Sequence, residues 1–173
     1  KNRVDVSEPA EDYEGTDIGY LVEIDNYNEA PSFYVDYCGA TVTDIQGIKR
    51  QFVGSDYSIK NDIYSDEQKW FIEQYVNGVF EIMYEACENE NYLTFDENYN
   101  LVPSSYKNAK DTISAVADLD SIVNSYILEE ICCDNDCGEG SFFMCVDFSK
   151  NSKYKKLTFT APWDYNWGYE DRV

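Results

Sequence analysis

The chain has 173 residues, of which 43% are hydrophobic and 16% aromatic, so it is long enough to bury the core of a single domain. Its 34 acidic and 13 basic side chains leave a formal charge of −21, which argues against nucleic acid and anionic membranes as partners. The absence of histidine excludes a Ser-His-Asp triad, a Cys-His pair and every histidine metal site, so any acid–base chemistry depends on carboxylates, Tyr, Cys or Lys.

Short strands are predicted in the first third of the chain. Residues 1–18 are polar and acidic and indicate an extended loop. Residues 19–25 are rich in large apolar side chains and predict a strand, and shorter strands are predicted over 32–37 and 47–53. Alternation along the first strand places one set of side chains on a single face, which consists of Tyr20, Val22 and Ile24.

Ser65 begins the first predicted helix. Together with Gln68 it forms a capping box, and apolar residues recur at helical spacing up to about Cys87. Residues 88–111 are polar and predict a long connection, with a short helical turn near 107–115. We expect the apolar stripe of the helix to be buried; it consists of Trp70, Phe71, Tyr75, Val79, Ile82, Met83 and Ala86.

Asp118 begins the second predicted helix, which covers residues 122–133. Glu129 and Glu130 lie near its C-terminal end, where the helix dipole disfavours negative charge. Either a cation or hydrogen-bond donor lies close to these carboxylates, or they are exposed to solvent. The predicted apolar face of the helix consists of Ile122, Val123, Tyr126, Ile127 and Ile131.

Two acidic segments flank a predicted β-hairpin. Residues 134–141 form an acidic loop, 142–148 predict a strand, 150–156 form a basic turn and 156–160 predict a second strand. The segment 161–168, with the sequence APWDYNWG, follows directly. Because the two strands of a hairpin are antiparallel, we expect both acidic segments at the same end of it.

Asp164 lies between two tryptophans, Trp163 and Trp167, and is followed by Gly168, which permits a sharp turn. Aromatic neighbours lower the local polarity, so a carboxylate here needs a metal, a cation or several donors. The alternative is a Trp-rich edge of the core with a solvated Asp.

Six cysteines are present, and buried thiols are the expected state because Cys is among the most buried residue types. A Cys-only zinc site is the alternative, although the spacing fits no common ligand pattern. Its ligands would be Cys132, Cys133, Cys137 and Cys145.

The acidic loop is compatible with more than one chemistry. A calcium loop of the EF-hand type beginning at Asp134 would need Glu at its twelfth position, which is Cys145. Phosphoryl transfer fits better: a loop Asp accepts a proton, a polar ligand follows about five residues later, and a second Asp after a hairpin holds magnesium. Asp136, Ser141 and Asp164 occur in this order.

A carboxylate-pair glycosidase is a further alternative. It would use Asp134 or Asp136 with Glu23. This chemistry requires the two carboxyl groups to lie at a set separation across a sugar cleft.

The chain resembles the CotH family of spore-coat-type atypical protein kinases, which also occur in bacterial extracellular proteins. The resemblance is carried by residues 1–5, 19–25, 118–131, 134–136 and 162–168, and the helix with the Pro-Trp-Asp block is its specific part. It implies an α+β fold, a protein-kinase-like C-terminal lobe of helices packed with short β-hairpins, over 1–173 as a single domain. The N-terminal nucleotide-binding part is then expected upstream of Lys1, and activity is expected only with that part present.

The resemblance also implies a function: transfer of the ATP γ-phosphoryl group to Ser of a protein substrate with Ser-rich basic segments. Asp136 is then the catalytic base. Asp164, Ser141 and Asn166 are the ligands of Mg²⁺, and these three residues bind the cofactor together with Trp163. The family often has Asn and Asp where this chain has Ser141 and Asn166, so a non-catalytic kinase-fold binding or assembly module is the alternative. The implied location is extracellular or the spore surface of a bacterium. No apolar run approaches membrane-spanning length and no signal peptide is visible.

Overall fold

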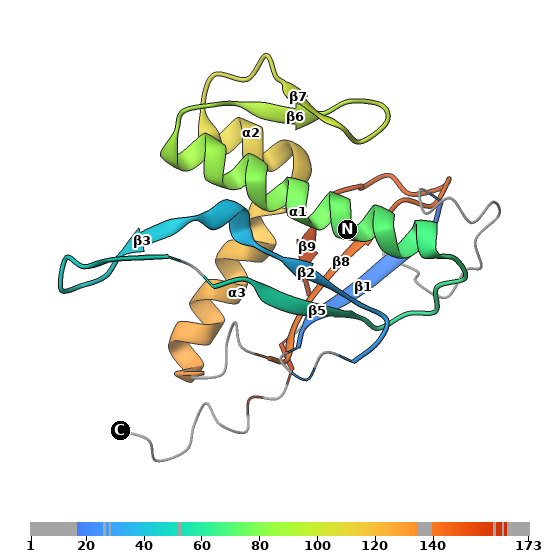
Figure 1. Ribbon diagram of the computed structural model, residues 1–173, viewed down its shortest axis with the longest axis horizontal. Coiled ribbons are helices and arrows are strands. Elements are labelled where there is room, and N and C mark those ends of the chain that lie inside the picture. Colours follow the sequence, from blue (N-terminus) through green and yellow to red (C-terminus); the bar gives the residue numbers. More distant parts are fainter. Residues whose placement is uncertain are drawn as a thin grey trace.

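A five-stranded antiparallel sheet forms the centre of this α+β protein (Figure 1). The structure is a computed structural model that describes residues 17–25, 27, 29–51, 53–134, 140–160, 162, 163 and 165. The strand order is β2-β5-β1-β8-β9. The bounds of these strands are Gly19–Ile24 for β1, Ser32–Val35 for β2, Ser55–Ile59 for β5, Phe142–Asp147 for β8 and Thr158–Phe159 for β9.

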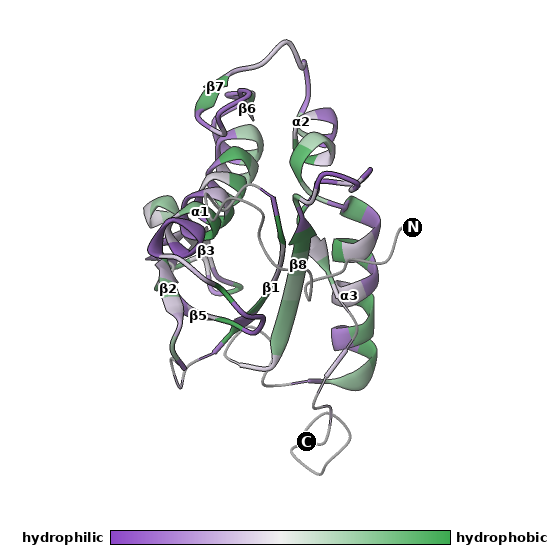
Figure 2. Ribbon diagram, turned by 90° about the vertical axis from the view of Figure 1, so that its right-hand side faces the viewer, coloured by the Kyte–Doolittle hydropathy of each residue, from purple (hydrophilic) through white to green (hydrophobic). Residues whose placement is uncertain are grey.

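Strand β1, which the sequence predicts as a strand, lies in the middle of the sheet. It pairs with β8 over six residues, from Gly19 opposite Asp147 to Ile24 opposite Phe142. The predicted inward face is confirmed, because Tyr20, Val22 and Ile24 are all buried. In Figure 2, β1 and β8 lie between helices α1 and α3.

Helix α1 (Asp66–Glu88) lies against the sheet and supplies much of the core. The predicted cap is confirmed: the Ser65 side chain accepts a hydrogen bond from the N–H of Gln68 at 3.1 Å, and the buried Gln68 side chain accepts one from the N–H of Tyr64. Contact with the sheet includes the rings of Tyr20 and Phe71, whose centroids are 6.2 Å apart.

One expectation for α1 is wrong, because Trp70 is 64% exposed. Nine residues at about 100° each place Trp70 about 180° around the helix from the fully buried Val79. Ile72 and Val76, which the predicted stripe left out, are buried in its place.

Several strands lie where the sequence predicted only loops. The segment predicted as a long connection contains a hairpin of β6 (Leu93–Phe95) and β7 (Leu101–Pro103), which contacts α1 and α2. The predicted strand at 47–53 is reduced to β4 (Lys49–Gln51), which pairs with β3 (Thr41–Thr43). Strand β5, which separates β2 from β1, was not predicted because its sequence, SDYSI, is largely polar.

The last two helices agree with the sequence in extent but not in packing. Helix α2 (Ala109–Val116) matches the predicted helical turn, and α3 (Leu119–Cys132) begins after its predicted cap, Asp118. Most of the apolar face predicted for α3 is exposed, and only Ile122 of that set is partly buried. The exposed members are Val123, Tyr126, Ile127 and Ile131, at 52%, 64%, 48% and 66%.

The N-terminus of α3 is attached to β9 by hydrogen bonds. Ser121 Oγ donates to the carbonyl oxygen of Asp118 at 2.7 Å and accepts from the N–H of Phe159 at 3.0 Å. The N–H of Asp118 donates to the carbonyl oxygen of Leu157 at 2.9 Å. Since β9 has only two residues, these bonds fix its position relative to the helix.

Replacing Ser121 by Ala tests this junction. The change leaves the partly buried N–H of Phe159 without its acceptor, so we expect a loss of about 1–3 kcal/mol in the free energy of unfolding. Urea denaturation measures it. The matched control is Asn124→Ala at an exposed position of the same helix, where a change within about 0.5 kcal/mol is expected. Equal effects of the two substitutions would contradict the assigned role of Ser121.

Candidate functional site

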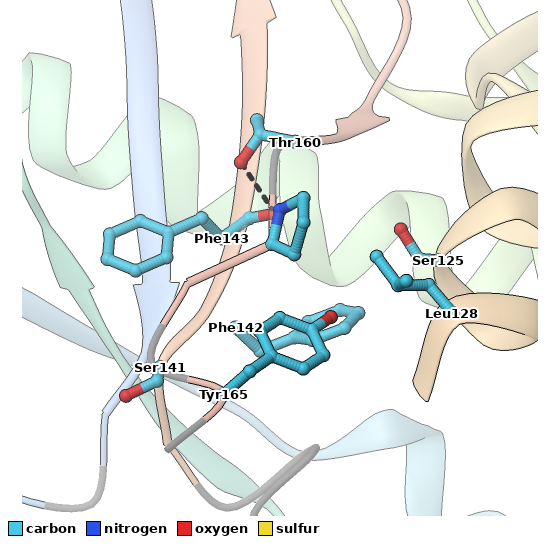
Figure 3. Close-up of a pocket in the computed structure, with 8 residues that line it drawn as sticks. Ser125, Leu128, Ser141, Phe142, Phe143, Thr160 and Tyr165 are labelled. Atoms are coloured by element: carbon cyan, nitrogen blue, oxygen red, sulfur yellow. Dashed lines mark hydrogen bonds between the residues drawn. The ribbon is translucent and has the colours of Figure 1, made fainter. Parts of the chain in front are cut away.

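The β8–β9 hairpin brings together the chain segments on its two sides. Thr160, just after β9, donates to the carbonyl oxygen of Phe143 through its N–H at 3.0 Å and its hydroxyl at 3.3 Å (Figure 3). Ser141, which precedes β8, and Pro162, which follows β9, line the same small cavity, together with Tyr165. The expected arrangement is therefore confirmed for the described ends of both acidic segments.

The predicted site residues are only partly described. Asp136, Asp164 and Asn166 lie outside the described residues. Ser141 has a left-handed backbone (φ 53°), and Figure 3 shows its hydroxyl pointing away from Tyr165. Trp163 is 64% exposed, and its ring centroid lies 6.3 Å from that of Phe143.

A tyrosine beside the Trp-Asp block is bonded to helix α3. The hydroxyl of Tyr165 donates to Glu129 Oε1 at 2.5 Å. Burial and this carboxylate both raise the pKa of Tyr165, so it remains a donor at neutral pH. Of the two explanations for an acid near the C-terminal end of α3, a nearby donor is thus the one observed for Glu129. The role of Tyr165 was not predicted, because its partner is 36 residues away in the chain.

Glu129 also lies beside a second carboxyl group, that of Asp134. Burial raises the pKa of Glu129, the hydrogen bond from Tyr165 lowers it, and Asp134 raises it, with a net upward shift. The Oε2 atom of Glu129 is buried and has no hydrogen-bond partner among the described residues. Glu129 Oε2 is therefore a buried acceptor beside a second carboxyl group, a setting that favours a proton or a cation.

A cavity of about 510 Å³ opens beside this carboxyl pair, between α3 and the β8–β9 hairpin. One wall carries Glu129 and Asp134, and the other consists of the rings of Phe142 and Phe159, packed edge to face with centroids 5.2 Å apart. Carboxylate oxygens beside an apolar wall suit a cationic group or a hard metal ion. Within the described residues, no three His, Cys, Asp or Glu side chains are grouped closely enough to hold a metal ion.

The glycosidase alternative is not supported by the surroundings of Glu23. Its carboxylate pairs with Lys60 Nζ at 2.7 Å, and the same ammonium bonds to Asp25 at 3.2 Å and Glu29 at 2.9 Å. Burial lowers the pKa of Lys60, but these three carboxylates outweigh it and raise the pKa overall. The described residues that line the cavity beside Asp134 do not include Glu23.

The cysteines are divided between core and surface. Cys132 and Cys145 are buried, as expected, whereas Cys38, Cys87 and Cys133 are exposed. Burial and then Asp147 raise the pKa of Cys145 to about 11, so its thiol is protonated at neutral pH. Cys137, the remaining ligand of the hypothetical zinc site, lies outside the described residues.

The pKa of Glu129 should respond in opposite directions to its two neighbours. Tyr165→Phe removes a donor that favours the ionised form, so the pKa should rise further, whereas Asp134→Asn removes a negative neighbour, so it should fall. Because the pKa of Glu129 is raised on folding, its contribution to stability is fully present below its unfolded value of about 4.3 and is lost as the pH rises through the folded value.

Carbon-13 NMR titration of the side-chain carboxyl of Glu129 measures both shifts. The same direction of shift in the two variants would contradict the carboxyl pair.

No protein-family model, no curated protein and no solved structure matches this chain. In the part of the chain that the structure describes, no helix has an apolar stretch long enough to span a bilayer.

Proposed function

We propose that the chain is a kinase-like lobe of the CotH type. In its full-length protein it takes part in the transfer of the ATP γ-phosphoryl group to a Ser hydroxyl of a protein substrate. The observation that carries the proposal is the convergence of the two acidic segments at one end of the β8–β9 hairpin, where Ser141 and Pro162 line the same cavity. In protein kinases, the proton-accepting Asp and the metal-binding Asp come from two separate segments of the chain.

Each residue of the proposed site has a role that its chemistry supports. Asp136 accepts the proton of the attacking hydroxyl while the oxygen bonds to the γ-phosphorus and ADP leaves. Asp164, Ser141 and Asn166 would hold Mg²⁺ through their side-chain oxygens. When bound, the ion would neutralise charge on the phosphates.

The bond from Tyr165 to Glu129 supports the role proposed for Asp164. Tyr165 follows Asp164 directly, and its hydroxyl connects this segment to the C-terminal end of α3, from which the loop containing Asp136 continues. An oxygen-rich setting fits a hard cation, because Glu129 Oε2 is a buried acceptor without a donor among the described residues.

The charge of the chain supports a basic partner. A formal charge of −21, with Glu129, Glu130 and Asp134 lining the cavity beside the proposed site, attracts a protein with Ser-rich basic segments. An extracellular or spore-surface location follows from the proposed family only.

A non-catalytic binding module of the same fold is the second candidate. The observation that favours it is the orientation of Ser141, whose hydroxyl points away from the cavity (Figure 3). Such a module would bind a partner without turnover. Calorimetry with Mg²⁺ and ATP distinguishes the two, since a pseudo-enzyme binds neither ligand or binds both with no ADP formed.

Phosphate incorporation tests the catalytic proposal. The protein at its full natural length is incubated with labelled ATP, Mg²⁺ and a basic Ser-rich peptide. We expect incorporation that Asp136→Asn and Asp164→Asn each lower by about 100-fold or more, because proton transfer and metal binding are both removed.

The matched control is Asp120→Asn, an exposed acid in the first turn of α3, which should leave the rate unchanged. Absence of incorporation in the natural protein, or equal rates in all three variants, would refute the proposed activity.

A further inference from the structure

A second cleft lies at the far end of the molecule from the carboxyl pair. It has a volume of about 320 Å³ and lies between α1 and the β6–β7 hairpin. Figure 1 shows this hairpin at one end of the molecule and the C-terminal end of α3 at the other. Helix α1 contributes Trp70, Gln74 and Glu81, and the hairpin contributes Asn98 and Tyr99. This volume falls within the range of small-ligand sites, about 300–1,000 Å³.

The floor of the cleft is a fixed cluster of aromatic rings. Phe95 of the hairpin stacks on Tyr75 of α1 with centroids 5.2 Å apart, and Tyr99 packs edge to face on Phe71 at 5.1 Å. Gly78 allows this close approach, since a Cβ atom there would meet the ring of Phe95 at 2.7 Å. The two walls of the cleft are therefore held together by core packing.

The turn of the hairpin is held by one carboxylate. Asp96 Oδ1 accepts hydrogen bonds from the N–H groups of Asn98 and Asn100 at 2.8 and 2.9 Å, and the N–H of Tyr99 donates to the carbonyl oxygen of Asp96 at 3.1 Å. The backbone of Tyr99 is left-handed (φ 59°). This network fixes the backbone of Asn98 and Tyr99 at the mouth of the cleft, so little backbone entropy is lost on binding.

Three side chains at the cleft have groups available for a ligand. Trp70 is 64% exposed, and Gln74 lies one turn further along the same side of α1. No hydrogen bond to another described residue is made by the side chains of Trp70, Gln74 or Asn98. The two amides can each donate and accept, and the indole offers a large apolar face with one donor.

The lining of the cleft selects the chemical class of ligand. No Lys or Arg is among the described lining residues and Glu81 is acidic, so phosphates and carboxylates are disfavoured. A wholly apolar ligand would leave the amides of Gln74 and Asn98 without hydrogen-bond partners. A neutral sugar suits both kinds of group. The apolar C–H face of its ring can pack on an aromatic ring, and its hydroxyls can donate to and accept from the amides.

We propose that this cleft binds a neutral carbohydrate, with a sugar ring on the face of Trp70 and its hydroxyls bonded to the amides of Gln74 and Asn98. The site is independent of the proposed phosphoryl transfer. Its distance from α3 allows an activity at one end of the molecule while the other end is attached to a glycan.

Calorimetric titration with cellohexaose, xylohexaose and mannohexaose tests the proposal. At least one of the three should bind the full-length protein, and Trp70→Ala should weaken that binding by about tenfold or more, since aromatic contacts dominate such affinities. Gln74→Ala and Asn98→Ala should each weaken it by about threefold to tenfold through the loss of one hydrogen bond.

The control is Tyr27→Ala, an equally drastic change at a 92% exposed aromatic side chain outside the cleft, which should leave the affinity unchanged. Thermal unfolding confirms that each variant is folded. Failure of all three oligosaccharides to bind at millimolar concentration, or undiminished binding by Trp70→Ala, would overturn the proposal, as would a cleft that takes up only an apolar dye.

Discussion

The attachment of α3 to β9 is the contact on which the proposed site depends. Strand β9 pairs with β8 over two residues only, which is too short a ladder to hold the following segment by itself. Ser121 and Asp118 supply the missing constraint by bonding to Phe159 and Leu157. The segment with the Trp-Asp block follows β9 directly in the chain. The residues that cap α3 therefore also fix the position of the edge strand β9.

Tyrosine makes the core of this acidic chain possible. The hydroxyls of buried tyrosines find partners inside the protein: Tyr20 donates to the carbonyl oxygen of Gln68, and those of Tyr37 and Tyr57 lie 3.0 Å apart. Burial raises the pKa of Tyr20 and of Tyr57, so both remain neutral. Large apolar rings thus fill the interior while the hydroxyls of these tyrosines have hydrogen-bond partners.

Glu129 is tolerated near the C-terminal end of α3 because it has a specific neighbour, Tyr165, which donates a hydrogen bond to it. Burial and the nearby Asp134 raise its pKa. A pair of neighbouring carboxyl groups favours binding of a proton or a cation at this position. The cleft beside Trp70 differs, because its described lining residues include aromatic rings and amides and a single acid, Glu81. The two ends of the molecule therefore suit different ligands.

The sequence alone determined the strands at 19–24 and 142–147, the cap at Ser65 and the hairpin that unites the acidic segments, because these depend on local alternation and capping. Only the tertiary structure decided the rest. Strand β5 is polar in sequence and is a strand because β1 and β2 pair with it on both sides. Trp70 fits an apolar stripe, yet it is exposed because the sheet contacts the opposite side of α1. The partner of Glu129 likewise depends on where the chain returns after β9, and no local pattern records that path.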